Sequence, residues 1–167
     1  MRVYVPLTLP GLAEAHRTGE LGAGPFTGYA VTPALRAWYR SDDVEELEYA
    51  ALGRAALASL RLLAADEDAP RRRIVVAVDV ADGAVTAASD GGAEPGEVTV
   101  KVTVPLAKAA AVHADADDAE RDVTAAARAL AAADGGDEAA QTTVDEAEDH
   151  ELLWFATQEL PNLLGRP

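Results

Sequence analysis

The segment that most constrains the fold is the apolar run from Ile74 to Val80, in which Asp79 is the one polar residue. β-Branched residues dominate the run, it is too short for an independent helix, and Pro70 and Gly83 bracket it. These properties predict a strand that is buried on both faces. Asp79 lies near the predicted C-terminal end, where open α/β sheets place ligands, so it is the first candidate for a functional carboxylate.

Length and composition narrow the class of protein. A chain of 167 residues predicts a single domain, residues 1–167, with one sizeable core. The absence of cysteine excludes disulfides, thiolate zinc sites and cysteine nucleophiles. No signal peptide is recognisable, and no window approaches the roughly 18 apolar residues of a membrane helix. We therefore expect a cytoplasmic protein with no membrane association.

The chain is strongly acidic, with a formal charge of −15. Such a surface repels phosphates, which argues against a nucleic-acid partner and, weakly, favours a basic protein partner. Heavy use of alanine is typical of a GC-rich bacterial genome, so many alanines are interpreted as filler.

Three helix starts are marked by capping residues. Thr8 precedes Leu9-Pro10, and Thr32 precedes Pro33, which places proline in a first helical turn both times. Residues 41–43, Ser-Asp-Asp, open the main helix, which is expected to run to about Ala65. Apolar residues occupy much of this helix's circumference, so either a sheet and a second helix or a partner subunit should cover it.

The segment from Ala81 to Gly96 is rich in glycine and has no periodic pattern, which predicts a flexible surface loop. In residues 97–104, valines alternate with polar residues, which predicts a strand with one face exposed to solvent. The sequence V-x-V-P-L occurs at residues 3–7 and again at 102–106, which suggests two similar halves joined by the loop. Chance recurrence in a valine-rich chain explains this echo equally well.

These patterns together predict an α/β (or α+β) fold, with helices packed on a mixed sheet of about five or six strands and with a two-fold internal pseudo-repeat if the echo is real. The acidic segment from Thr142 to Asp149 is expected to form a weak edge strand or a loop. An aromatic strand at residues 152–155 should follow it and dock onto the core or onto a partner.

Candidate metal and catalytic residues are few. Residues 115–120 resemble a calcium loop only at the first two ligand positions, so helix capping is the better explanation and no metal site or cofactor is predicted. The histidines show no metal-ligand spacing. His113 stands out because it lies at a predicted strand end beside Asp115.

Arg71, Arg72 and Arg73 form the basic cluster of the chain. Arginine forks match carboxylates and phosphates, so Arg71 and Arg73 are candidate ligand-binding residues. The structural alternative is that they pair with the acids at positions 66–68, which immediately precede them.

Three stretches carry a resemblance to a known family: residues 2–8 (RVYVPLT), residues 73–79 (RIVVAVD), and the ending ELLWF at 151–155 with QEL at 158–160. In these the chain resembles an uncharacterised family of small acidic actinobacterial proteins, a domain of unknown function. The resemblance implies a bacterial cytosolic protein and transfers no site residue.

Two functions are compatible with the sequence. The first is a non-enzymatic interaction or regulatory protein that self-associates, for example as a homodimer, or binds a basic protein through its acidic surface. The alternative is a small-molecule hydrolase or lyase that uses Asp79, His113 and Glu151 as acid–base groups and Arg73 as an anion holder. The absence of any catalytic motif favours the first, non-enzymatic function.

Overall fold

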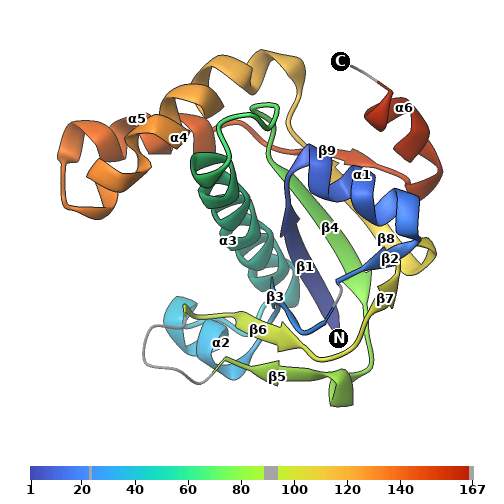
Figure 1. Cartoon of the computed structure of the whole chain (residues 1–167). Coiled ribbons are helices and arrows are strands. Elements are labelled where there is room, and N and C mark those ends of the chain that lie inside the picture. Colours follow the sequence, from blue (N-terminus) through green and yellow to red (C-terminus); the bar gives the residue numbers. More distant parts are fainter. Residues whose placement is uncertain (23, 89–93, 166–167) are drawn as a thin grey trace.

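The computed structural model describes residues 1–22, 24–88 and 94–165. Its main sheet has seven strands in the order β5-β6-β3-β1-β4-β8-β9 (Figure 1). The strands are β1 (Arg2–Leu7), β3 (Phe26–Tyr29), β4 (Ile74–Asp79), β5 (Val85–Ala87), β6 (Glu97–Val100), β8 (Ala109–Ala114) and β9 (Leu153–Phe155). A two-stranded ribbon pairs β2 (Glu20–Leu21) with β7 (Val104–Pro105). The α/β class is confirmed, but the sheet has seven strands instead of five or six. It is also not mixed, because all neighbouring strands of the described sheet pair antiparallel.

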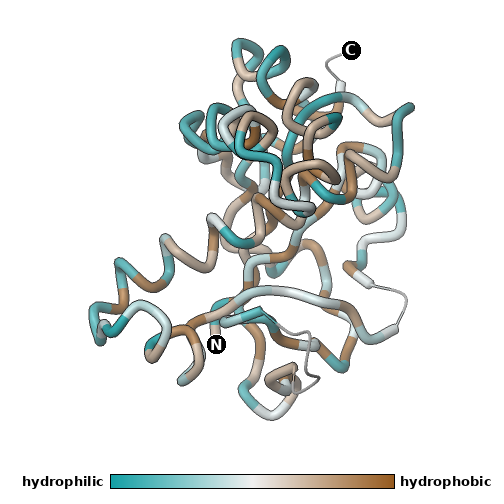
Figure 2. The backbone as a smooth tube through the Cα atoms, turned by 90° about the vertical axis from the view of Figure 1, so that its left-hand side faces the viewer, coloured by the Kyte–Doolittle hydropathy of each residue, from teal (hydrophilic) through white to brown (hydrophobic). Residues whose placement is uncertain are grey.

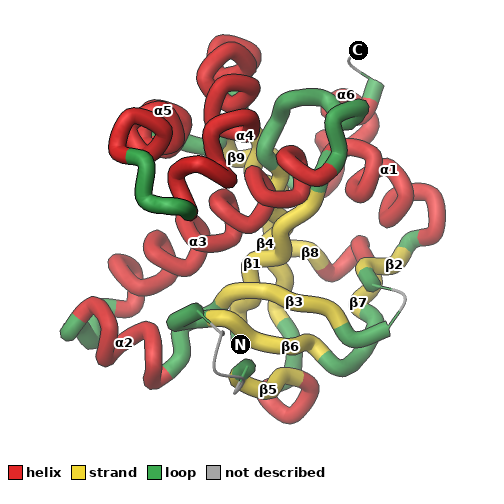
Figure 3. Tube along the Cα trace, turned by 60° about the vertical axis from the view of Figure 1, so that its left-hand side comes forward, coloured by secondary structure: helices red, strands yellow, loops and turns green. Residues whose placement is uncertain are grey.

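Helices cover both faces of this sheet. They are α1 (Leu9–Thr18), α2 (Pro33–Tyr39), α3 (Val44–Ala65), α4 (Glu120–Asp134), α5 (Glu138–Glu148) and α6 (Leu160–Leu164). Short 3-10 turns are η1 (Asp82–Ala84), η2 (Leu106–Lys108), η3 (Asp117–Ala119) and η4 (Thr157–Glu159). Figure 3 shows α3, α4 and α5 on one side of the strands and α1 and α6 on the other.

The predicted central strand is β4, which lies between β1 and β8 and is buried from Ile74 to Val78. Alternate residues of the sheet enter two cores. Val3, Val76 and Val112 face the core that contains α1 and α6, whereas Tyr4 and Val75 face α3. Hydrophobic positions lie along the central strands and along the helices around them (Figure 2). Burial on both faces explains why β4 is apolar almost throughout.

The expected helix starts are confirmed by their caps. The side chains of Thr8 and Thr32 accept hydrogen bonds from the backbone N–H groups of Gly11 and Leu35. The Asp43 carboxylate accepts from the N–H groups at the start of α3, which runs to Ala65 as predicted. Local side-chain chemistry therefore sets these helix starts.

Two segments differ from expectation. Residues 142–149 mostly belong to α5, whose Val144 and Ala147 pack against α4 in a shared core. The predicted loop 81–96 contains η1 and the edge strand β5, which pairs with β6. The part of that predicted loop at 89–93 lies outside the described residues.

The V-x-V-P-L echo does not mark equivalent strands. Residues 3–7 lie within β1, in the middle of the main sheet, whereas 102–106 contain β7, which pairs with β2 in the ribbon. In the described part of the chain, no helix combines the length and the apolar character that crossing a membrane requires.

Candidate functional site: a cleft over the back of α3

A hollow with both polar and apolar lining lies on the outer side of α3, facing away from the sheet. This α3 cleft has a volume of about 530 Å³. It is lined by α2 (Tyr39), by α3 (Tyr49, Ala50, Leu52, Gly53, Arg54, Ala56 and Leu57), by Arg73, and by the segment 148–152 (Glu148, His150, Glu151 and Leu152). The chain leaving α5 passes α3 on its way to β9 (Figure 1). Its residues 148 and 150–152 supply one wall of the α3 cleft.

The floor of the α3 cleft exists because α3 is apolar on more sides than its neighbours cover. The sheet covers Leu47, Ala51 and Ala55, and α4 covers Leu60 and Leu63 near the C-terminal end. The predicted covering by a sheet and a second helix is therefore correct for these parts of the helix. The middle of its outer face has no covering element among the described residues.

Gly53 lies in the middle of this uncovered face. A Cβ atom placed there would meet nothing within 4 Å, so packing in this chain does not require a glycine at that position. Glycine inside a helix destabilises it by roughly 0.5–1 kcal/mol relative to alanine. Its effect here is to leave the floor of the α3 cleft flat and open.

The opposite wall, residues 148–152, is acidic, and we call it the acidic wall. Glu151 accepts a long hydrogen bond of 3.5 Å from the hydroxyl of Tyr49. The pKa of Glu148 is raised, first because its carboxyl is partly desolvated against the protein and then because Asp145 is nearby. The positive charge of Arg73 acts in the opposite direction. Both carboxylates line the α3 cleft, and neither forms a salt bridge among the described residues.

Arg73 anchors the acidic wall to the sheet. Its side chain is 3% exposed, and that of its partner Asp115 is 1% exposed. Nε and Nη2 of Arg73 donate to the two carboxylate oxygens of Asp115 at 2.9 and 2.7 Å. Nη2 also donates to the carbonyl oxygen of His150 at 3.0 Å, and the ring of His150 contacts Asp122 on α4 at 2.7 Å. The wall is thus held at both β4 and α4.

The other two arginines of the cluster have backbone partners. Arg71 donates to the carbonyl oxygens of Leu63, Asp66 and Ala69 and so closes the C-terminal end of α3. Arg72 donates to the carbonyl oxygen of Asp115 at 2.7 Å. The acids at 66–68 are therefore not the side-chain partners of the cluster among the described residues. Arg71 has a structural role, and only Arg73 reaches the α3 cleft.

Asp79 is the exposed last residue of the central strand β4, and its carboxylate forms an ion pair with Arg2 of β1. Nε and Nη2 of Arg2 donate to its two oxygens, both at 3.1 Å. This hydrogen-bonded pair lowers the pKa of Asp79. The carboxylate is thus paired with a cation on its own sheet, and it does not line the α3 cleft.

His113 lies on β8, directly opposite Val75 of β4. Val75 precedes Asp79 by four residues along β4. At about 3.3 Å per residue, the two candidates are about 13 Å apart along the strand. The ring of His113 lies beside Tyr4, with centroids 6.4 Å apart, and burial lowers its pKa. Asp79 and His113 therefore do not form a direct acid–base pair.

Antiparallel pairing explains this separation. The expectation that strand ends meet at one edge holds for parallel sheets, whereas adjacent antiparallel strands end at opposite edges. Asp79 and His113 both lie near the ends of neighbouring strands, β4 and β8, and so are placed apart. The same pairing brings Arg73, just before β4, against Asp115, just after β8.

Of the sequence candidates, Arg73 and Glu151 meet in the α3 cleft. Sequence reasoning missed Glu148, Tyr49, Arg54 and Gly53. The acidic segment 142–149 predicts a weak edge strand or a loop, and neither indicates that Glu148 lies beside α3. A glycine in the middle of an apolar helix was the one available signal of an open face.

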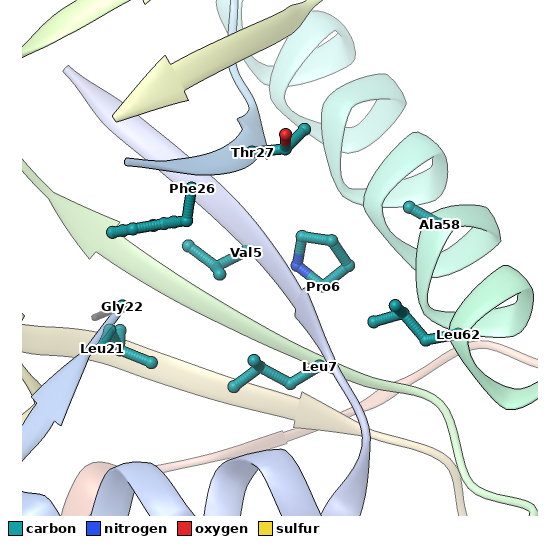
Figure 4. A pocket seen from close by; sticks show the side chains of 9 residues that line it. All are labelled: Val5, Pro6, Leu7, Leu21, Gly22, Phe26, Thr27, Ala58 and Leu62. Carbon is teal, nitrogen blue, oxygen red and sulfur yellow. The ribbon is translucent and has the colours of Figure 1, made fainter. Parts of the chain in front are cut away.

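A second hollow, of about 350 Å³, opens between β1, β3 and α3 (Figure 4). Side chains including Leu7, Phe26 and Leu62 surround it, and Thr27 is the one polar side chain of its lining. It contains no charged side chain. Among the described residues, no group of three or more histidine, aspartate or glutamate side chains is arranged to hold a metal ion.

Comparisons with known proteins address the family rather than the activity. Neither the curated proteins nor the solved structures contain a match to this chain. A family model, by contrast, matches residues 1–164. The chain belongs to the family of unknown function DUF6912.

Proposed function

We propose that this protein is a non-enzymatic interaction module whose α3 cleft binds a segment of a basic protein. The observation that carries the proposal is the uncovered apolar face of α3 beside the acidic wall. An apolar surface rimmed by polar residues is typical of a protein-binding site.

Exposed aromatic side chains support a macromolecular occupant. Trp38 and Tyr49 are each 65% exposed, and Tyr39 is 40% exposed. Large aromatic residues are enriched in protein interfaces because they bury much apolar area on binding. Tyr39 and Tyr49 both line the α3 cleft.

Charge favours a basic partner over a second copy of this chain. Glu148 and Glu151 are available to cations, since the charge of Arg73 is already matched by Asp115. The whole chain carries −15, so a basic segment is attracted at long range whereas another copy is repelled.

The proposal is tested with defined peptides and fluorescence anisotropy. A labelled peptide rich in leucine and arginine is compared with a matched peptide in which glutamate replaces arginine. Wild type should bind only the arginine peptide, with an affinity that falls as salt is added. Equal binding of the two peptides, or binding of neither, would overturn the proposal.

Matched glycine variants locate the binding. Gly53→Leu fills the floor of the α3 cleft, and Gly83→Leu adds the same side chain at another glycine with open space around it, in η1. Gly53→Leu should no longer bind the arginine peptide, whereas Gly83→Leu should bind it as wild type does. Retention by Gly53→Leu would mean diffuse attraction to an acidic surface. Sedimentation showing a dimer that only Gly53→Leu dissociates would replace the basic partner with a second copy.

A further inference from the structure

Arg54 lines the α3 cleft where α2 adjoins α3, and its guanidinium lies beside Trp38 and Tyr39 of α2. Its side chain is only 18% exposed, although it is a charged residue on the outer face of α3. Its Nε is buried with no hydrogen-bond partner, the one such side-chain atom among the described residues. Leaving a buried donor unpaired costs about 1–3 kcal/mol, and more for a charged group, so this nitrogen calls for an acceptor.

The nearest carboxylate does not supply that acceptor. Nη1 of Arg54 lies 3.8 Å from Oε2 of Glu94, which is beyond hydrogen-bond distance. That oxygen approaches Nη1 and leaves Nε unpaired. The Nε donor of the Arg54 guanidinium therefore remains without an acceptor among the described residues.

Two aromatic rings hold the guanidinium in place. Cζ of Arg54 lies 5.8 Å from the ring centroid of Trp38 and 5.7 Å from that of Tyr39. Such contacts fix the plane of the fork and leave its edge for a planar, bidentate anion. Because Nε is closed to solvent, an acceptor reaches it only if a neighbouring side chain moves.

We propose that Arg54 binds a carboxylate carried by the segment that occupies the α3 cleft. This inference rests on the proposed function and deepens it, since it gives the bound segment a direction. The carboxylate lies at Arg54 between Trp38 and Tyr39, and the basic side chains lie at the acidic wall. The carboxylate comes either from an acidic side chain or from the C-terminus of the partner chain.

Peptide chemistry distinguishes these two sources. The arginine peptide is prepared with aspartate or with asparagine at one end, and each form is made with a free or an amidated C-terminus. We expect the preferred carboxylate form to bind about tenfold more tightly than its neutral counterpart, as a charged hydrogen-bonded pair would give. Equal affinity of all four peptides would overturn the inference and leave the proposed function intact. Failure of all four to bind would overturn both.

Arginine variants assign the effect to one side chain. Arg54→Gln should abolish the carboxylate preference, and Arg54→Lys should restore only part of it, because lysine keeps the charge without the fork. Arg61→Gln is the matched control: Arg61 is also on α3, but its guanidinium pairs with Asp134 at 2.6 Å, and it does not line the α3 cleft. A full preference in Arg54→Gln would contradict the inference.

Trp38 provides a readout of the local change. In a Trp154→Phe background, Trp38 is the only tryptophan, since the chain contains two. Its emission should shift when the carboxylate peptide binds and should shift less with the neutral peptide. An identical shift with both would place the carboxylate away from Arg54.

Discussion

Asp115 accepts three hydrogen bonds from Arg73, two from the guanidinium and one of 2.8 Å from the backbone N–H. The pair extends the register of β4 and β8 by one position beyond Ile74 and Ala114. Since Arg73 also donates to the carbonyl oxygen of His150, a single buried ion pair joins the sheet to the acidic wall. The position of the acidic wall, and with it the shape of the α3 cleft, thus depends on the buried Arg73–Asp115 pair at the end of the sheet.

Removing one member of this pair should be strongly destabilising. Asp115→Ala leaves the guanidinium of Arg73 buried without its counter-charge, which typically costs 3–5 kcal/mol, so we expect a loss of about that size. Urea denaturation followed by circular dichroism measures the free energy of unfolding.

An exposed ion pair serves as the control. Asp79→Ala breaks the pair with Arg2, whose side chain is 41% exposed, and should change stability by no more than about 1 kcal/mol. The double variant Arg73→Met with Asp115→Leu should recover much of the loss, because it removes both charges together. Equal effects of the two aspartate variants would refute a special role for the buried pair.

Features set by neighbouring residues could be predicted from the sequence. The caps Thr8, Thr32 and Asp43 act within one helical turn, and the apolar run of β4 reports burial on both faces of one strand. Each of these depends on residues close in the chain, so the sequence predicts both threonine caps, the start of α3 within residues 41–43, and the strand β4.

Features set by long-range pairing could not be predicted in the same way. Nothing local indicates that β4 lies antiparallel to β8, so the sequence does not show that Asp79 and His113, the acid–base groups of the enzyme alternative, lie at opposite edges of the sheet. The pairing of Arg73 with Asp115 could not be predicted for the same reason, because it depends on the antiparallel pairing of β4 with β8. Glu148 was missed for a different reason: α5 buries only Val144 and Ala147, too few apolar positions for a helical pattern to stand out.

Ser59 should contribute more to stability than its size suggests. Its hydroxyl donates to the carbonyl oxygen of Leu7 at 2.7 Å and accepts from the N–H of Ile74 at 3.0 Å, which bridges β1 and β4 where their pairing ends. Ser59→Ala removes the partner of the buried N–H of Ile74 and of the partly buried carbonyl of Leu7, for an expected loss of about 1–3 kcal/mol. Thermal unfolding checks this value, with the exposed Thr103→Ala as the control expected to stay within about 0.5 kcal/mol.

Two glycine-to-alanine substitutions should have opposite signs. Gly53→Ala places a methyl group in open space in the middle of α3 and should stabilise the protein by about 0.5–1 kcal/mol. Gly28→Ala places its Cβ 2.4 Å from Cγ1 of Val3 and should destabilise it by about 1–3 kcal/mol. Denaturant midpoints of the two variants provide the measurement. A stabilised Gly28→Ala would contradict the close approach of β3 to β1.

The stability of the protein should decrease as the pH falls, because His113 resists protonation. Burial, and then the nearby charge of Arg2, lower the pKa of His113 below its usual value of 6.5. The unfolded chain therefore binds this proton at a higher pH than the folded protein does, and stability rises with pH in that interval. The contribution is present above about 6.5 and is lost as the pH falls through the lowered pKa. Titration of the His113 ring by NMR, combined with urea denaturation across this range, checks both the direction and the cause. His113→Gln should flatten this part of the pH dependence, whereas His16→Gln, on the exposed side of α1, should keep it.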